Sequence, residues 1–392
     1  MKKVFYWSPY LTNVATIHAV INSMKSLKKF SSEYEPTIIN CCGEFNAYKN
    51  DLRKSEIKII NLFPFDYHKL LPSKGFFFSR FSYLLIFILS FFPLLFLIKS
   101  KKPDFLILHL ITSLPLLIAN LINTKTKFIL RISGLPKYNL FRKIYWSHLG
   151  KKIYKVTCPT EGTLKDLKYL KLFESNKIYI LKDPIIKIND LIKSKNHEDK
   201  QIFNEDDFNI ICVGRLTRQK NFKLIINSFD KFLEIKKNSK LFIIGNGEEK
   251  NDLIKLIRLK KLDDKIKILG FKNNIFYYFS KANLFVLCSL WEDPGWVLIE
   301  AAANNTLILA SNCKNGPSEF LENGKGGILF QNESAQSLID NYKKIVELSK
   351  SEVIRKKIFS KKKSKQYTLF QHNLVLVKIF QLKKLQTEYL EK

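Results

Sequence analysis

Residues 210–221 read IICVGRLTRQKN, an apolar run that ends at a glycine and continues into a basic loop. The apolar, β-branched residues predict a buried strand over 210–213, and Gly214 lets the backbone turn tightly at its end. An amphipathic stretch follows, which predicts a helix. A strand, a glycine turn and a helix in this order are typical of the βαβ units of a parallel sheet.

Apolar strands and amphipathic helices continue to alternate in both directions from this stretch. Downstream, five more apolar runs predict strands at residues 241–244, 266–269, 284–287, 307–311 and 327–329. Upstream, seven runs do so at 4–7, 37–40, 57–60, 105–109, 128–132, 155–158 and 178–181. We therefore expect an α/β fold of two Rossmann-like, doubly wound parallel-sheet domains that face a cleft, followed by C-terminal helices.

A polar stretch at residues 186–207 divides the two series of strands. Asp183 and Pro184 break the last strand of the first series, and the residues after them are weakly periodic, as in a linker. The sequence thus predicts an N-terminal domain at 1–185, the linker, and a C-terminal domain at 208–350. Basic helices are expected over 351–392, as a solvated face or a membrane-facing patch, packing back on the N-terminal domain.

The charge of the chain indicates an anionic partner. Its 392 residues carry 66 Lys and Arg against 35 Asp and Glu, a formal net charge of +31. Phosphorylated ligands, an anionic membrane surface and nucleic acid all attract such a protein. Arginine is the residue that most often reads guanine, yet only eight of the cations are arginines, and no nucleic-acid motif is present. We expect no nucleic-acid partner, and a nucleic-acid-binding protein is kept only as a remote alternative.

One apolar run approaches the length that a membrane requires. Residues 81–98 read FSYLLIFILSFFPLLFLI, without a charge, between Arg80 and Lys99. Three interpretations are open: insertion in the plane of the membrane, a buried core helix, and a span. Pro93 and the lack of a second such segment disfavour the span. Because the flanking lysines favour anionic headgroups, we expect a peripheral or monotopic protein at the inner, cytoplasmic face of the cytoplasmic membrane.

The cysteines indicate a reducing compartment. They form no CxxC pair and have no histidine at a metal-ligand spacing, which predicts reduced packing residues in a cytosolic protein. The amino terminus lacks the apolar length of a secretory signal. The six residues are Cys41, Cys42, Cys158, Cys212, Cys288 and Cys313.

Two carboxylates separated by seven residues form the strongest candidate site. They are Glu292 and Glu300 in EDPGWVLIE, where Pro294 and Gly295 mark a turn before a helix. Such a turn directs unpaired amide groups and the positive end of the helix dipole at a ligand, which suits phosphate. The carboxylates can accept hydrogen bonds from sugar hydroxyls.

Two other loops follow predicted strands in the same half of the chain. Arg215 and Lys220 lie after the strand at 210–213, where their charges can neutralise a diphosphate. Residues 245–248 read GNGE after the strand at 241–244. This short glycine motif is either a ligand loop or a plain tight turn.

Five elements in a fixed order carry a family resemblance. They are GRLTRQKN at 214–221, IIGNGEE at 243–249, ILGF at 268–271, SLWEDPGWVLIEAAA at 289–303 and GPSEFLENGKGGILF at 316–330. Over about residues 208–332 the chain resembles the carboxyl-terminal half of family-4 retaining glycosyltransferases. The resemblance is to the bacterial surface-polysaccharide and lipopolysaccharide type, which has the GT-B fold.

The resemblance implies that these elements bind a nucleotide-sugar donor. Glu300 would bond the ribose, and Glu292, as a catalytic residue, would contact the transferred hexose. Arg215 and Lys220 would hold the diphosphate leaving group in place of a metal ion. The other donor-binding residues would be Gly214, Gly295, Trp296, and, beside the nucleotide base, Gly270 and Phe271.

The amino-terminal half resembles the family less closely. His109 follows a predicted strand where many members have an active-site histidine that contacts the donor sugar; its alternative role is to cap a strand end. The first βα loop lacks the glycine pair that the family commonly has there. The acceptor-side candidates are Asn13, Arg131, Ser133 and Glu161.

These patterns together predict a retaining glycosyltransferase of cell-surface glycan synthesis. It would move a hexose or N-acetylhexosamine from a nucleotide diphosphate sugar, by family frequency a UDP-sugar, to a lipid-linked or polysaccharide acceptor such as a lipopolysaccharide or capsule precursor. No metal or other cofactor is expected, because no DxD-like motif lies near these loops. The alternative is another reaction on the same fold, epimerisation or phosphorolysis.

Overall fold

The computed structural model describes residues 1–12, 15–72, 75–134, 140–193 and 202–382. Contacts among these residues divide the chain into two units. The first unit contains Met1–Pro159, Thr163–Pro184 and the described residues from Leu369 onward. The second contains Thr160–Gly162 and Ile185–Thr368. Asn13, one of the acceptor-side candidates, lies outside the described residues.

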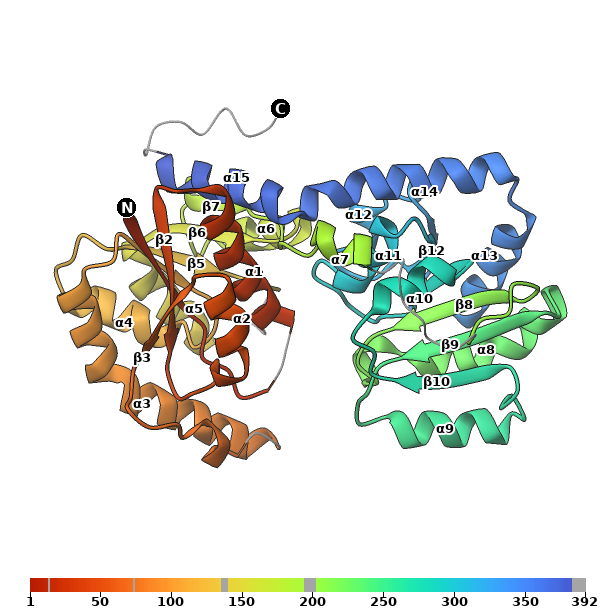
Figure 1. Cartoon of the computed structure of the whole chain (residues 1–392), viewed down its shortest axis with the longest axis horizontal. Coiled ribbons are helices and arrows are strands. Elements are labelled where there is room, and N and C mark those ends of the chain that lie inside the picture. The colour runs from red at the N-terminus through yellow and green to blue at the C-terminus, as the bar shows by residue number, and fades with distance from the viewer. Residues whose placement is uncertain (13–14, 73–74, 135–139, 194–201, 383–392) are drawn as a thin grey trace. The chain divides into compact units, whose positions relative to one another are not determined.

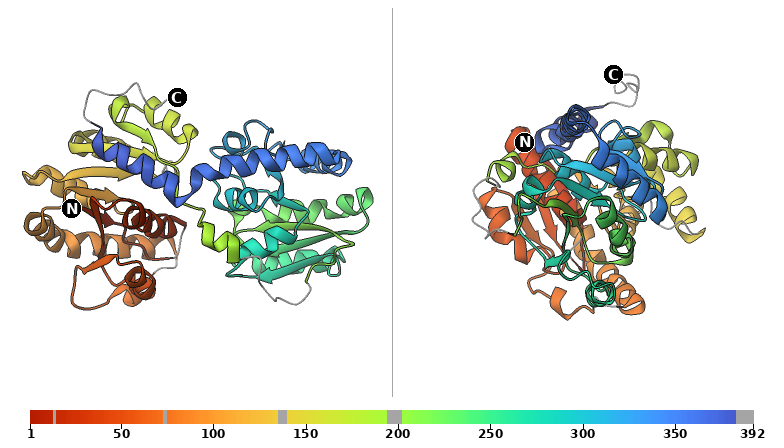
Figure 2. Two further views of the ribbon diagram at one scale, coloured as in Figure 1. Left: turned by 45° about the horizontal axis from the view of Figure 1, so that its top comes forward. Right: turned by 90° about the vertical axis from the view of Figure 1, so that its right-hand side faces the viewer.

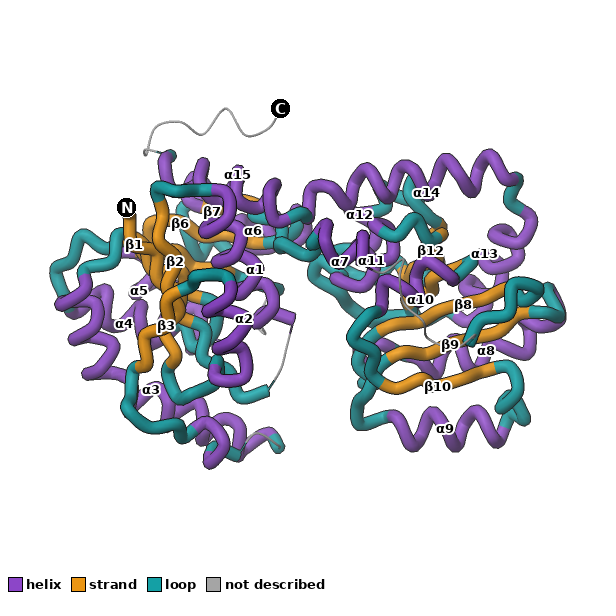
Figure 3. The backbone as a smooth tube through the Cα atoms, in the orientation of Figure 1, coloured by secondary structure: helices purple, strands orange, loops and turns teal. Residues whose placement is uncertain are grey.

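Seven parallel strands form the sheet of the first unit, in the order β3-β2-β1-β4-β5-β6-β7 (Figures 1 and 3). They are β1 (Lys2–Trp7), β2 (Tyr34–Asn40), β3 (Lys58–Asn61), β4 (Phe105–Leu108), β5 (Lys127–Arg131), β6 (Ile153–Cys158) and β7 (Ile178–Ile180). The order reverses between β1 and β4, which is where doubly wound sheets bind ligands at the carboxyl ends of their strands. All seven predicted strands are present.

Helices cover both faces of this sheet because successive strand residues point to opposite sides. Val4 and Tyr6 pack in one cluster, whereas Phe5 and Trp7 pack in the other. The first cluster includes residues of α1 (Ala15–Phe30), α2 (Lys49–Lys54) and α15 (Leu369–Gln381). The second includes residues of α3 (Phe76–Lys101), α4 (Ser113–Leu121), α5 (Leu140–Leu149) and α6 (Glu161–Tyr169). The 3₁₀ turns are η1 (Asn46–Tyr48), η2 (His68–Leu70), η3 (Gly150–Lys152) and η4 (Ser175–Lys177).

Six parallel strands form the sheet of the second unit, in the order β10-β9-β8-β11-β12-β13. They are β8 (Phe208–Val213), β9 (Ser239–Ile244), β10 (Ile266–Gly270), β11 (Leu284–Leu287), β12 (Leu307–Ser311) and β13 (Ile328–Phe330). These are also the strands predicted from the sequence, and the order reverses between β8 and β11. The two doubly wound parallel sheets confirm the predicted α/β fold class.

The second sheet is likewise covered on both faces. One cluster contains residues of α8 (Phe222–Ile235), α9 (Lys250–Leu259) and α13 (Ala335–Glu347). The other contains residues of α10 (Ile275–Lys281), α11 (Trp296–Ala303) and α12 (Pro317–Phe320). This unit also holds α7 (Ile188–Lys193) and the 3₁₀ turns η6 (Arg218–Lys220) and η7 (Lys365–Tyr367).

The C-terminal helices belong to different units. The basic helix α14 (Lys350–Ser364) packs against α11, and the Lys356 ammonium donates to the carbonyls of Gly324 and Gly327 at 2.8 and 3.1 Å. α15 packs against α1 and buries Leu376 and Ile379. Residues 351–392, expected as one set of basic helices, are therefore divided, because α15 contributes apolar residues to the core of the first unit.

Candidate functional site

Three loops at the carboxyl ends of β8, β9 and β10 are joined by backbone hydrogen bonds. The Leu216 amide donates to Asn246 O, and the Gly245 amide donates to Gly270 O, both at 2.9 Å. A Cβ atom at Gly245 would overlap the carbonyl oxygen of Gly214, and one at Gly247 would overlap that of Leu216. The loop at 245–248 is therefore more than a plain tight turn, because its glycines let the first two loops approach each other.

The basic loop after β8 places two cations differently. Leu216 is fully buried and anchors the loop, which continues through the 3₁₀ turn η6. Arg215 is exposed, so its guanidinium can reach a ligand in solvent. Lys220 is half-buried, and its ammonium forms an ion pair with the Glu292 carboxylate. The structure thus brings together two residues that were predicted to bind different parts of one ligand.

Glu292 is held by more than this ion pair. Its side chain is 7% exposed, and Oε1 also accepts a hydrogen bond from the Ser289 hydroxyl at 2.6 Å. Ser289 is fully buried, and its own carbonyl accepts from the Ser311 hydroxyl at 2.7 Å. Hydrogen bonds from an ammonium and a hydroxyl compensate the carboxylate for its lost hydration. Ser289 was not predicted, although it lies three residues before Glu292 at the end of the same strand.

Helix α11 begins directly after the Glu292 loop. Gly295, with φ of +94°, caps its amino terminus, a conformation that glycine adopts without strain. Trp296 is the first helical residue and Glu300 lies one turn later on the same side, both half-buried. The helix is fixed by Leu298 and Ile299, which are fully buried. The start of a helix carries the positive end of its dipole, which can attract an anion.

The end of β10 offers an apolar surface beside these loops. Gly270 has φ of +71° and ends the strand, and the Phe271 side chain that follows is 69% exposed. An exposed phenyl ring can stack on a planar aromatic ligand. A separate cavity of about 460 Å³ lies on the α8 side of the basic loop. None of the predicted donor-binding residues lines it; the residues that do are Arg218, Asn221, Lys223, Leu224, Asn227, Glu249, Leu290 and Glu333.

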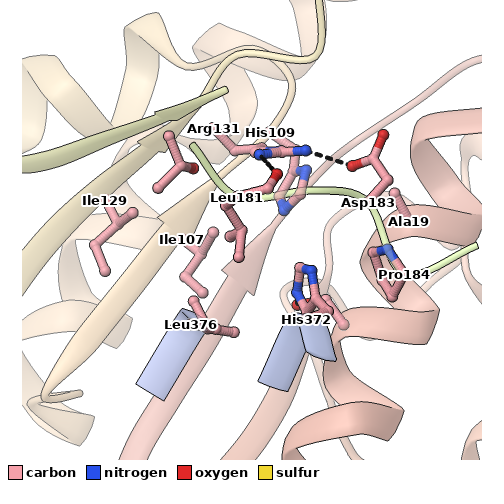
Figure 4. Close-up of a pocket in the computed structure, with 12 residues that line it drawn as sticks. Ala19, Ile107, His109, Ile129, Arg131, Leu181, Asp183, Pro184, His372 and Leu376 are labelled. Atoms are coloured by element: carbon pink, nitrogen blue, oxygen red, sulfur yellow. Dashed lines mark hydrogen bonds and ion pairs between the residues drawn. The ribbon is translucent and has the colours of Figure 1, made fainter. Parts of the chain in front are cut away.

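In the first unit, His109 lies at the carboxyl edge of the sheet, directly after β4 (Figure 4). Its amide donates to Trp7 O at 2.9 Å, and its ring stacks on Tyr6. Nδ1 is buried and has no hydrogen-bond partner in the part of the chain that the structure describes. Burial, together with the nearby Arg131 and His372, holds the pKa of His109 well below its ordinary value. The imidazole is therefore neutral near pH 7.

Arg131 differs from the acceptor-side role expected for it. It is buried at the end of β5, where its guanidinium donates to Leu181 O at 2.5 Å and pairs with Asp183 (Figure 4). This buried pair links the ends of β5 and β7. Removing either partner would leave the other charge buried and unpaired, so the pair has a structural role. Ser133 is exposed two residues after Arg131. Glu161 is also exposed, and it belongs to the stretch Thr160–Gly162 that is grouped with the second unit.

His372 completes the cluster around His109 and was not predicted. Its Nδ1–H donates to Lys182 O at 2.7 Å, and Nε2 lies 2.9 Å from the Ser23 hydroxyl. Together with His109, Arg131 and Asp183 it lines a cavity of about 10 Å³, enough for about one water molecule. No local signal could have identified it, because it comes from α15, far along the chain.

The described residues contain no group of three His, Cys, Asp or Glu side chains arranged to hold a metal ion. All six cysteines are buried and free. Arg215 and Lys220 place positive charge at the edge of the second sheet, near the start of α11.

Comparison with known proteins identifies similar chains. A model of the family described as "Glycosyl transferases group 1" matches residues 193–365. An uncharacterized glycosyltransferase of Methanocaldococcus jannaschii is 32% identical over 242 residues, which are 57% of this chain and 59% of that protein. A Campylobacter jejuni protein is 27% identical over 340 residues, 84% of each chain. It is named GalNAc-α-(1→4)-GalNAc-α-(1→3)-diNAcBac-PP-undecaprenol α-1,4-N-acetyl-D-galactosaminyltransferase. Matches to three of the curated relatives span 59% to 63% of their length.

Solved structures show the same architecture. A glycosyltransferase from Rickettsia africae matches with a TM-score of 0.75 at 18% identity, over 97% of both chains. An Anabaena protein crystallised with UDP matches with a TM-score of 0.69 at 14% identity, over 96% of this chain and 99% of that one. At these identities the likeness concerns the fold, and it confirms the GT-B arrangement of two Rossmann-like domains expected from the sequence.

Proposed function

We propose that this chain is a retaining glycosyltransferase, on the premise that its residues 193–365 match the glycosyl transferases group 1 family. It moves a hexose or N-acetylhexosamine from a nucleotide diphosphate sugar to a lipid-linked or polysaccharide acceptor of cell-surface glycan synthesis. The observation that carries this proposal is the Lys220–Glu292 ion pair, which lies at the point where the strand order reverses and directly before the start of α11.

The donor binds at the carboxyl edge of the second sheet. Lys220 and Arg215 hold the diphosphate, and Glu292 accepts hydrogen bonds from hydroxyl groups of the transferred sugar. Breaking the bond between sugar and diphosphate builds negative charge on the leaving phosphate, and fixed cations beside that phosphate lower the barrier. Glu300, one turn into α11, bonds the ribose.

The nucleotide base lies against the end of β10. Gly270 turns the chain there, and the exposed Phe271 ring gives a surface on which a base can stack. The Anabaena neighbour was crystallised with UDP, so a UDP-sugar is the first donor to test. We propose that transfer needs no metal ion, because Arg215 and Lys220 supply the positive charge; activity in excess EDTA should then equal activity with added Mg²⁺.

The first unit supplies the acceptor side and a neutral histidine. His109 directly follows β4 at the sheet edge and is half-buried, and a neutral imidazole can donate a hydrogen bond to a sugar hydroxyl or accept one from it. We propose retention at the anomeric carbon, with an oxygen of the leaving phosphate taking the acceptor's proton. NMR of the product linkage tests the stereochemistry.

The acceptor is a glycan carried on a polyprenyl diphosphate at the cytoplasmic face of the membrane. The Campylobacter relative is named for such an acceptor, and the net charge of +31 suits an anionic membrane surface. Incubation of the purified protein with UDP-sugars and a synthetic undecaprenyl-diphosphate glycan should give an acceptor heavier by one sugar.

Nucleotide binding gives the most direct test of the donor site. Thermal unfolding is measured with UDP, GDP, CDP and ADP, and with their sugar conjugates, for the native sequence and for Glu300→Ala. A ligand at a hundredfold excess over its Kd stabilises the folded state by about 2.7 kcal/mol. We expect one nucleotide to raise the Tm of the native protein and to have little effect on the variant. If no nucleotide stabilises the protein, with or without lipid vesicles, the proposed function is wrong.

A further inference from the structure

Helix α3 has one face in the core of the first unit and the other in solvent. Ile86, Leu94 and Ile98 are fully buried, and so are the two serines on the same side, Ser82 and Ser90. The opposite side carries six large apolar side chains that are between 55% and 81% exposed. We call them the α3 ridge: Phe77, Phe81, Leu84, Ile88, Phe92 and Phe96.

The ridge is continuous along the helix. Its residues are spaced by three or four positions, so they lie on one side of an α-helix over almost its whole length. If a full aromatic side chain has about 200 Å² of surface, the ridge exposes roughly 700 Å² of apolar area. That exceeds the few hundred Å² usual for a soluble monomer and indicates an interaction surface. In two views α3 lies at the periphery of its unit, with its outer side uncovered by other helices or strands of that unit (Figures 1 and 2).

The buried side of α3 is bonded to the rest of the unit. The Ser82 hydroxyl donates to Pro72 O at 2.8 Å, and the Ser90 hydroxyl lies 2.9 Å from the Cys41 thiol. By length and composition α3 could cross a membrane, since an 18-residue window within Phe77–Lys101 has a mean hydropathy of 2.5. A spanning helix would have to give up these polar contacts and the packing of Ile86 and Leu94. The packing of one side of α3 therefore favours a helix that remains docked on the first unit and exposes only the α3 ridge.

The charges around α3 indicate an anionic partner. Residues 57–103 contain seven lysines and arginines and a single acidic residue, Asp66. Lys99, Lys101 and Lys102 are exposed at the carboxyl end of the helix. A second copy of the chain, packed ridge to ridge, would bring two such basic regions together and is disfavoured. Anionic headgroups would neutralise the lysines while the acyl chains below them receive the phenyl rings.

We propose that the α3 ridge inserts into one leaflet of an anionic bilayer, with the helix axis parallel to the membrane plane. The ridge side chains lie among the acyl chains, and the lysines at the end of α3 contact lipid phosphates. Membrane insertion by α3 extends the proposed function. It rests on that function only for which membrane is meant, the one that holds the acceptor. The proposal names a lipid surface as the partner, so binding can be measured without glycosyl transfer.

Insertion of α3 would also fix the distance between the bilayer and the carboxyl edge of the sheet in the first unit. Cys41, which Ser90 contacts, begins the loop after β2, and the amides of Cys41 and Cys42 donate to the buried Glu44 carboxylate at 3.1 and 2.7 Å. That loop lies at the same carboxyl edge as His109. A lipid-linked acceptor in the leaflet would therefore meet an edge that α3 fixes relative to the membrane.

Vesicle flotation of the full chain tests the partner. The vesicles contain phosphatidylcholine alone or phosphatidylcholine with phosphatidylglycerol. We expect binding to the anionic vesicles, and a loss of at least tenfold for Phe81→Ser/Ile88→Ser/Phe92→Ser. The matched control is Leu259→Ser, which removes a side chain that is 82% exposed on α9 and should bind like the native protein. Native-like binding by the triple variant, or no binding by the native chain, overturns the proposal.

A second measurement separates in-plane insertion from a span and from self-association. A cysteine at position 81, 88 or 96 carries a fluorophore, and lipid-attached quenchers report its depth in the bilayer. In-plane insertion predicts the same shallow depth at all three positions, whereas a span predicts three different depths and overturns the proposal. Light scattering without vesicles should show a monomer; a dimer that the triple variant abolishes also overturns it.

The proposed function can fail independently of this one. The triple variant leaves the second unit unchanged, so its nucleotide-induced Tm shift should equal that of the native protein. Loss of vesicle binding with an unchanged nucleotide shift supports membrane insertion by α3. If the protein binds vesicles but no nucleotide changes its Tm, the transferase proposal is wrong and the proposal of membrane insertion by the α3 ridge still holds.

Discussion

Lys220 and Glu292, 72 residues apart in sequence, form an ion pair at the carboxyl ends of β8 and β11. These two strands pair in the middle of the second sheet, at the reversal of its strand order. The family resemblance implies that Lys220 binds the diphosphate and that Glu292 contacts the transferred sugar. Because the two side chains touch, a donor that meets both must place its bond between sugar and phosphate next to this pair.

Removing either member of the pair should lower both stability and activity. Both side chains are largely buried, so Lys220→Met or Glu292→Gln leaves its partner without an opposite charge, at a cost of about 3–5 kcal/mol in the free energy of unfolding. Each variant should also lower kcat by roughly 10²–10³, as loss of a charge-stabilising group does. Urea unfolding and initial rates with the donor measure the two effects.

The double variant shows whether the two residues act together. If they are coupled, Lys220→Met/Glu292→Gln should cost less stability than the two single changes combined, by at least about 1 kcal/mol. Exposed Arg215 is the control, because Arg215→Met should lower activity with little change in unfolding. Additive effects on stability would contradict direct pairing of Lys220 with Glu292.

The buried histidines of the first unit should make stability depend on pH. Burial lowers the pKa of His372 to about 4 and holds the pKa of His109 well below its ordinary value. An unfolded histidine has a pKa of about 6.5, so below that pH the unfolded chain binds protons that the folded chain does not. The free energy of unfolding should therefore fall as pH decreases from about 6.5 towards 4.

His372→Gln tests the source of this pH dependence. Glutamine can keep a hydrogen bond to Lys182 O or Ser23 but does not titrate, so the loss of stability on acidification should be smaller than in the native protein. His148→Gln, which changes an exposed histidine on α5, should leave the pH profile unchanged. Equal slopes for the native protein and His372→Gln would show that this residue does not titrate between folded and unfolded states.

The strands could be predicted because both faces of a parallel sheet are buried. Continuous apolar runs such as 210–213 and 284–287 therefore identify strands without an alternating pattern. The two-sided nature of α3 could not be predicted in the same way. Its residues are apolar all round, so the sequence shows no polar side, and only packing against the unit determines that Ile86 lies inside and Ile88 outside.

The candidate site was predictable where its residues follow strands. Arg215, Lys220 and Glu292 follow strands in connections that a parallel sheet must bring to one edge, and Glu300 lies in the helix that begins directly after the Glu292 loop. Contacts between residues far apart in sequence were not predictable. Arg131 at the end of β5 pairs with Asp183, which follows β7, and His372 belongs to α15, the last described helix. The ion pair explains why Arg131, which looks like a ligand residue from its position after β5, is buried.

The cysteines should react only when the protein unfolds. All six are buried, and burial raises the pKa of Cys288 to about 12 and that of Cys313 to about 11, so these two remain thiols at pH 8. A thiol reacts through its thiolate. Ellman's reagent should therefore label the native protein slowly and all six cysteines at once in guanidinium chloride. Fast labelling of the native protein by even one equivalent would contradict the burial.

Gly245 should tolerate no side chain, because it lies where two loops of the proposed donor site meet. Its φ of +147° is unfavourable for alanine, and a Cβ atom would overlap the carbonyl oxygen of Gly214, which is rigid backbone. Gly245→Ala should lower the free energy of unfolding by about 2–4 kcal/mol and weaken nucleotide binding, since the loop carrying Arg215 must move. Gly324→Ala is the matched control: it also has a positive φ, of +102°, but its Cβ would meet no atom closer than 3.8 Å. We expect Gly324→Ala to lower the free energy of unfolding only by its conformational strain, about 1–2 kcal/mol, with nucleotide binding unchanged. Urea unfolding measures both variants. Equal losses of stability would show that Gly245→Ala suffers only from backbone strain, and that the overlap with the Gly214 carbonyl has no effect.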